Sequence, residues 1–167
     1  MANLARLLRE RGDLAGAVEV VGRAIAAARP AGSATAAGAP AGDPRWLLER
    51  GLAHTAASRL EAALADFLAA ADAATRRPAT EVVPIAVENA AQAAYRLGRF
   101  PKAAGLYRRL ADLDPACPDP WKTLGAIQLY DLHDPAAARA SFQRALAVEI
   151  DAAERAQIEA LFAGLPK

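Results

Sequence analysis

Cysteine, aromatic residues and long hydrophobic runs are all scarce in this sequence. Cys117 is the single cysteine, which excludes an internal disulfide and makes a reducing compartment, the cytoplasm, the expected location. Aromatic residues make up only 5% of the 167 residues. No run approaches the roughly 18 apolar residues that a membrane helix needs, and the first residues carry charge too early for a secretory signal. We therefore expect no association with a membrane.

An excess of charge of one sign is also missing. The 20 lysines and arginines nearly balance the 19 aspartates and glutamates. The pair Arg108 and Arg109 is not part of a basic stripe with interleaved aromatic residues, which nucleic-acid binding requires. We expect this pair to lie on a solvated outer face, and we expect no nucleic-acid partner.

Residues for metal binding and catalysis are few and scattered. His54 and His133 lie far apart, and neither has a ligand partner three or four residues away. As a nucleophile, Cys117 would need a base beside it, and an unreactive thiol in the loop PACPDP is the favoured interpretation. No glycine-rich phosphate loop follows a strand. We therefore expect no enzyme, no metal site and no cofactor.

What the sequence does contain is alanine, leucine, arginine and glutamate, all good helix formers, whereas valine and isoleucine are too scattered for strands. Asp43 and Asp134 each precede a proline, as N-cap residues often do, and Asp151 with Glu154 has the spacing of a capping box. Two glycines can close helices in the left-handed conformation: Gly12 and Gly98. We expect helices at about 2–11, 13–28, 44–56, 59–74, 81–97, 100–113, 118–131, 135–148 and 152–163.

A fixed spacing of small and large residues recurs four times. A small residue is followed 12 or 13 positions later by a second small residue, then four further on by a larger one and three beyond that by an apolar one. Steps of four and three keep these last residues on one helical face. The small residues allow two helices to approach closely, and the larger ones are expected to fill the gap between hairpins. The four sets are Ala5, Ala17, Val21 and Ala24; Gly51, Ala63, Phe67 and Ala70; Ala91, Ala103, Tyr107 and Leu110; and Gly125, Ala138, Phe142 and Ala145.

This pattern resembles the tetratricopeptide repeat, a helix–turn–helix unit of about 34 residues. The best match has Trp121, Leu124 and Gly125 in its first helix, whereas another unit has Arg50 where the family favours leucine. The resemblance implies an all-α fold over a single domain, 1–167: a right-handed superhelical array of antiparallel helix pairs. The repeats are expected at about 1–29, 44–77, 84–117 and 118–151.

Two segments depart from the repeat. Residues 30–43 are small and uncharged up to Asp43, so we expect a flexible loop. At the other end, about 152–163 carries three apolar residues on one side: Ile158, Leu161 and Phe162. We expect this amphipathic helix to cap the apolar end of the stack.

In the family that the pattern resembles, the first helices line a concave groove that binds peptides or partner helices. The resemblance therefore implies a groove on the polar face of 81–97, continued on the next unit. An amide such as that of Asn89 can bond both the carbonyl and the N–H of an extended peptide, and Arg96 and Lys122 would favour an acidic residue in the partner. Alternatively, these are merely polar residues on an exposed helix face. The expected groove residues are Glu88, Asn89, Gln92, Tyr95, Arg96, Lys122 and Tyr130, with Arg6, Glu49 and Leu52 towards the N-terminus.

One subset of the family binds the acidic C-termini of chaperones through a two-carboxylate clamp, which needs a lysine and an asparagine on the first helix of one unit. Leu48 and Leu52 stand at the corresponding positions of the unit at 44–77. We therefore do not expect a chaperone adaptor.

The resemblance implies a non-catalytic interaction module that binds a peptide or helix of another protein. Two alternatives stay open. One is a regulatory or targeting domain of a larger enzyme or secretion-assembly protein. The other is a self-assembling structural subunit, a homo-oligomer whose groove is filled by residues 30–43 or by another copy.

Overall fold

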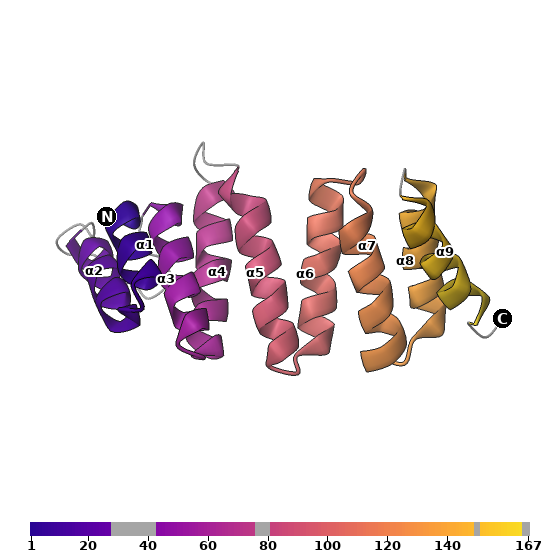
Figure 1. Ribbon diagram of the computed structural model, residues 1–167, viewed down its shortest axis with the longest axis horizontal. Helices are drawn as coiled ribbons and strands as arrows, with labels where there is room; N and C mark the ends of the chain where they lie inside the picture. Colours follow the sequence, from indigo (N-terminus) through magenta and orange to yellow (C-terminus); the bar gives the residue numbers. More distant parts are fainter. Residues whose placement is uncertain (28–42, 76–80, 149–150, 165–167) are drawn as a thin grey trace. The chain divides into compact units, whose positions relative to one another are not determined.

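The computed structural model describes residues 1–27, 43–75, 81–148 and 151–164, and these ranges contain helices and no strand (Figure 1). The all-α fold is therefore confirmed, and the described helix ends lie within one residue of the predicted ones. The loop predicted at 30–43 falls outside the described residues except for Asp43. The helices are α1 (Ala2–Glu10), α2 (Leu14–Ala27), α3 (Pro44–Ala56), α4 (Leu60–Thr75), α5 (Val82–Arg96), α6 (Phe100–Leu113), α7 (Pro118–Ala126), the π-helical segment η1 (Ile127–Asp131), α8 (Pro135–Ala147) and α9 (Ala152–Ala163).

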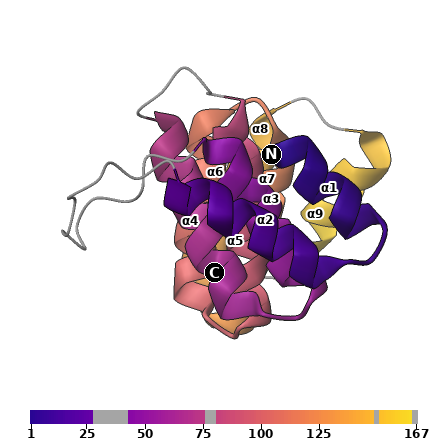
Figure 2. The same ribbon diagram turned by 90° about the vertical axis from the view of Figure 1, so that its left-hand side faces the viewer.

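The chain divides into two compact units, unit 1 (Met1–Leu97) and unit 2 (Gly98–Lys167). In unit 1, each of the helices α1 to α4 packs on the next one along the chain, and Figure 2 views this unit with α1 and α2 towards the reader. In unit 2, α6 packs on α7, α7 on α8 and α8 on α9. Antiparallel hairpins are therefore present in both units. The predicted repeat at 84–117 supplies α5 to unit 1 and α6 to unit 2.

The predicted helix caps are present. The Asp43 carboxylate accepts a hydrogen bond from the Arg45 backbone N–H at 3.0 Å, ahead of a proline at the first helical position. Asp134 and Asp151 cap α8 and α9 in the same way, with N···O distances of 2.9 and 2.8 Å. These bonds satisfy backbone N–H groups that the first turn of a helix leaves unpaired.

A residue with a left-handed backbone conformation occupies the same position in four helix–helix turns. Gly12 and Gly98, the predicted ones, have φ of 82° and 70°. Ser58 and His133 stand in the equivalent turns with φ of 58° and 53°, although neither is glycine. Each of the four lies five residues before a second-helix alanine of the repeat pattern: Ala17, Ala63, Ala103 and Ala138.

The small residues of the repeat pattern are buried. The four second-helix alanines are 0% exposed, and the ring of Phe142 packs against Gly125, where an added Cβ would lie 2.7 Å from Phe142 Cε1. The ring thus fills the space that the glycine leaves within its own hairpin, a contact that the sequence analysis does not assign to it. Among the described helices, none is both long and apolar enough to cross a bilayer.

Candidate interaction site

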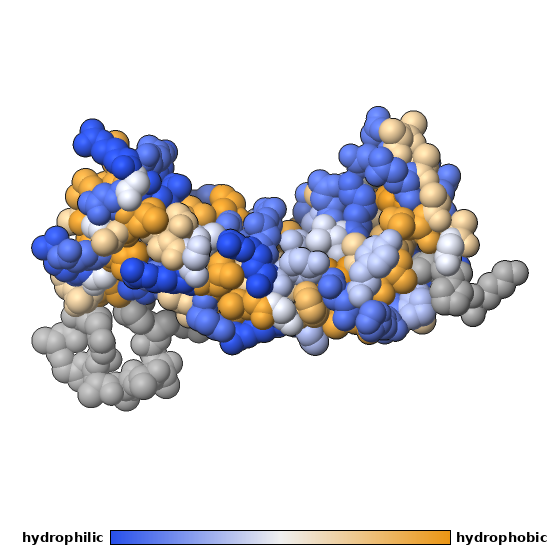
Figure 3. Space-filling model, turned by 60° about the horizontal axis from the view of Figure 1, so that its bottom comes forward, coloured by the Kyte–Doolittle hydropathy of each residue, from blue (hydrophilic) through white to orange (hydrophobic). Residues whose placement is uncertain are grey.

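Helix α5 has two distinct faces in unit 1. Ala90, Ala91 and Ala94 are 0% exposed and form its packing face. The polar residues predicted on the other face are exposed, except for the half-buried Asn89: Glu88, Gln92, Tyr95 and Arg96. Helical spacing therefore predicted correctly which residues of α5 reach solvent. Figure 3 shows one side of the molecule, on which hydrophilic and hydrophobic residues are mixed.

The amides of α5 are engaged within their own helix. Asn89 Nδ2 donates a hydrogen bond to the Ile85 carbonyl at 2.8 Å, and Gln92 Nε2 donates to Glu88 Oε1 at 3.3 Å. This bond uses one of the two N–H groups of the Asn89 amide, so the second N–H can still donate to a peptide backbone. Its oxygen can also accept a bond.

The predicted residue Lys122 forms two ion pairs in unit 2. Its Nζ lies 2.6 Å from Asp119 Oδ1 in α7 and 2.5 Å from Glu154 Oε2 in α9. Hydrogen bonds to Asp119 and then to Glu154 raise the pKa of Lys122 above its ordinary value. The sequence predicts Glu154 as part of a capping box, because spacing along one helix carries no information about a partner on another helix. Tyr130, in η1, is 59% exposed.

A cleft of about 460 Å³ opens beside Lys122, with walls from α7, α8 and α9. Its volume falls within the range of about 300–1,000 Å³ that is common for ligand sites. Apolar side chains and a few charged or polar groups meet there, the combination that binds amphipathic segments. The lining residues are Lys122, Thr123, Ala126, Phe142, Glu154, Gln157, Ile158 and Leu161.

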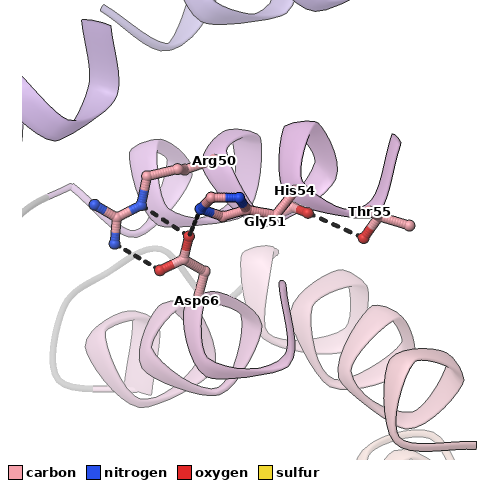
Figure 4. A network of polar contacts seen from close by, with 5 residues as sticks. All are labelled: Arg50, Gly51, His54, Thr55 and Asp66. Carbon is pink, nitrogen blue, oxygen red and sulfur yellow. Dashed lines mark hydrogen bonds and ion pairs between the residues drawn. The ribbon is translucent and has the colours of Figure 1, made fainter. Parts of the chain in front are cut away.

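A second polar cluster joins α3 to α4 in unit 1 (Figure 4). The Arg50 guanidinium donates two hydrogen bonds to the Asp66 carboxylate, at 2.8 and 2.6 Å, and His54 Nε2 lies 3.8 Å from the same carboxylate. Asp66 is only 6% exposed. Its charge is therefore compensated by Arg50, which explains the arginine found where the family favours leucine.

The histidine of this cluster is held in its neutral form. Burial lowers the pKa of His54, and the nearby charges of Arg50 and Arg59 lower it further, whereas Asp66 opposes the shift. His54 Nδ1 is buried without a hydrogen-bond partner. Because Arg50 and Asp66 join α3 to α4 through two hydrogen bonds, we interpret the cluster as a connection between two helices.

The remaining predicted groove residues lie near the N-terminus of unit 1. Glu49 accepts a hydrogen bond from Arg9 at 3.4 Å, Arg6 lies 3.8 Å from Glu10, and Leu52 is half-buried. In the ranges that the structure describes, no three His, Cys, Asp or Glu residues are grouped so that they could hold a metal ion.

Comparisons with known proteins agree with this architecture. Residues 68–118 match the family model described as tetratricopeptide repeat, and no curated protein sequence matches the chain. A tetratricopeptide repeat protein from Parabacteroides merdae has a similar structure, with a TM-score of 0.71, 20% identity, and coverage of 96% of this chain and 56% of that one. This chain thus spans little more than half of that protein.

Two further structures are similar. MamA has a TM-score of 0.64 and 14% identity over 95% of this chain and 81% of its own. The first TPR of Spaghetti (RPAP3), bound to the HSP90 peptide SRMEEVD, has a TM-score of 0.54 and 20% identity over 73% of this chain and 94% of its own. With the family-model match over residues 68–118 and the helical hairpins of both units, these likenesses show that the chain has the fold of tetratricopeptide repeat proteins.

Proposed function

We propose that the chain is a non-catalytic interaction module that binds a peptide or helix of a partner protein. The observation that carries this proposal is the cleft beside Lys122. A concave, mainly apolar site with a few convergent polar groups is the usual form of a binding site. The proposal is supported by the similar TPR of Spaghetti, which is bound to a peptide containing three acidic residues.

The polar face of α5 is proposed as a second contact region, in unit 1. Asn89, Gln92 and Arg96 offer hydrogen-bond donors and acceptors and one positive charge on one side of the helix. An acidic residue in the partner would complement Arg96 there and Lys122 in unit 2, because charge-assisted hydrogen bonds are stronger than neutral ones.

The experiment is a binding measurement on a partner captured from the source cell with the full chain as bait. We expect Lys122→Glu, Asn89→Ala and Arg96→Glu each to weaken binding by about tenfold or more, the equivalent of one lost charge-assisted bond. The matched control is Arg108→Glu, a charge reversal at an exposed arginine of α6. Full binding by the three variants, with loss only in the control, would place the site on the outer face and contradict the proposal.

Self-assembly is a second candidate, favoured by an apolar surface on α1. Met1, Leu4 and Leu7 are 64%, 46% and 47% exposed. Two of them line a cleft of about 360 Å³ with Val20, Arg23, Ala24 and Ala27. Exposed apolar ends of helical stacks favour contact with a further helix. Light scattering across a concentration series should then show a dimer that Leu4→Glu abolishes, whereas a monomer at all concentrations would exclude this candidate.

A further inference from the structure

Helix α9 is attached to the rest of unit 2 by few contacts. Ile158 is its single buried side chain, at 3% exposure. The Phe162 ring is half-buried and lies 4.6 Å from the Arg139 guanidinium of α8, and Arg155 donates a hydrogen bond to the Leu146 carbonyl at 3.1 Å. The remaining residues of α9 are exposed. A helix held in this way can leave its site at a low cost.

The residues of α9 that make these contacts form one stripe. Glu154, Ile158 and Phe162 are four residues apart, so they lie along the same side of the helix. Glu154 pairs with Lys122 of α7, and Ile158 lines the cleft. Phe162 lies against Arg139 of α8. The α7–α8 surface therefore receives a carboxylate, an aliphatic side chain and an aromatic ring at successive turns of a helix.

The fit of α9 to this surface is incomplete. The cleft between α7 and α9 keeps a volume of about 460 Å³, and Leu161, one of its lining residues, is 37% exposed. A helix with larger apolar side chains would fill more of this space and bury more apolar surface, which favours binding. The surface thus accommodates a better ligand than the helix that now occupies it.

We propose that α9 is a displaceable occupant of a helix-binding surface on α7 and α8. The partner is an amphipathic helix that places a carboxylate on Lys122 and presents an aliphatic and an aromatic residue one and two turns later. Binding of this helix displaces α9. This inference rests on the proposed function and specifies the chemistry of the partner for unit 2.

The probe is a fluorescent peptide with the sequence of residues 151–164, added to the full chain and followed by anisotropy. In the wild type, α9 competes with the peptide for its own site. In the Ile158→Glu chain the tethered helix has lost its buried side chain, so the free peptide should bind at least about tenfold more tightly. The matched control is Ala156→Glu, at an exposed position of α9, which should bind the peptide like the wild type.

Charge reversal then tests the surface itself. Adding Lys122→Glu to the Ile158→Glu chain should weaken binding of the peptide about tenfold, and a peptide carrying Glu154→Lys should restore it. If thermal melting shows that Ile158→Glu disturbs folding, Glu154→Ala in the chain, at an exposed position, loosens α9 and serves in its place. Peptide binding that is unchanged by release of α9, or indifferent to Lys122→Glu, overturns the inference.

The two proposals fail separately. A captured partner that depends on Asn89 and Arg96, together with a peptide that does not bind the released chain, removes this inference and leaves the proposed function. If the peptide binds and the α5 variants leave binding of the captured partner unchanged, the binding role is limited to unit 2.

Discussion

The ring of Phe67 in α4 lies directly against Gly51 in α3. A methyl group on Gly51 would come within 2.5 Å of Phe67 Cε1 and 2.7 Å of Cδ1. Phe67 is 1% exposed, and a closely packed ring has little room to retreat. Where phenylalanine stands in the second helix, glycine at this position is therefore a packing requirement, and Gly125 with Phe142 shows the same relationship in unit 2.

Gly51→Ala should destabilise the chain by about 1–3 kcal/mol, the usual cost of overpacking a core, although alanine is the better helix former. The measurement is denaturant unfolding monitored by circular dichroism. Gly105→Ala is the matched control, because it lies in α6 with no atom within 4 Å of the added Cβ. That variant should gain about 0.5–1 kcal/mol. Equal stability of Gly51→Ala and the wild type would mean that the α3–α4 contact is looser than described.

Ser58→Gly should stabilise the chain by roughly 1 kcal/mol. Ser58 has φ of 58°, a conformation that costs a residue with a Cβ about 1–2 kcal/mol and glycine almost nothing. The reverse change, Gly12→Ala, should destabilise the chain. Because no atom lies within 4 Å of its added Cβ, the loss measures the cost of the left-handed backbone conformation alone. Melting temperatures of both variants check the prediction, and a fall for Ser58→Gly would refute it.

The stability of the chain should decrease below about pH 6.5 through His54. Burial lowers the pKa of His54 in the folded chain, so the unfolded chain binds the proton more tightly. The contribution is complete above the unfolded pKa and is lost as the pH falls below it towards the folded pKa. Unfolding free energies of the wild type and His54→Gln between pH 7.5 and about pH 5 test this. The wild type should lose more stability on acidification, and parallel curves would contradict the assignment.

Asp66→Asn should destabilise unit 1 by about 2–4 kcal/mol, because it leaves the partly buried Arg50 without its bidentate partner. The double variant Arg50→Leu with Asp66→Leu should recover most of this loss, since an apolar pair of similar volume often replaces a buried ion pair without cost. A double variant as unstable as Asp66→Asn would show that the ion pair itself is required.

The helices of this chain could be predicted because their signals are local. Asp43 and Pro44 start helix α3, and Gly12 ends helix α1. Each of them determines the backbone only within a few residues of its own position. The exposed and buried faces of α5 follow equally from its period of 3.6 residues.

Contacts between helices could not be predicted in this way. The sequence predicts Glu154 as part of a capping box, and only the packing of α9 brings it to Lys122. The Arg50–Asp66 pair joins residues 16 positions apart on two helices, where spacing within one helix gives no signal. The left-handed backbone conformation of Ser58 is not predicted, because serine does not favour it. Only the position in the turn that Ser58 shares with Gly12 indicates it.

Hydrogen–deuterium exchange of the full chain, with and without a captured partner, tests the binding role most directly. The account predicts slower amide exchange in α5 and α7 on binding, because a bound segment stabilises the helices that it contacts. It also predicts faster exchange in α9, as this helix is displaced from unit 2. Slower exchange confined to α2, α4 and α6, with α9 unchanged, would contradict it.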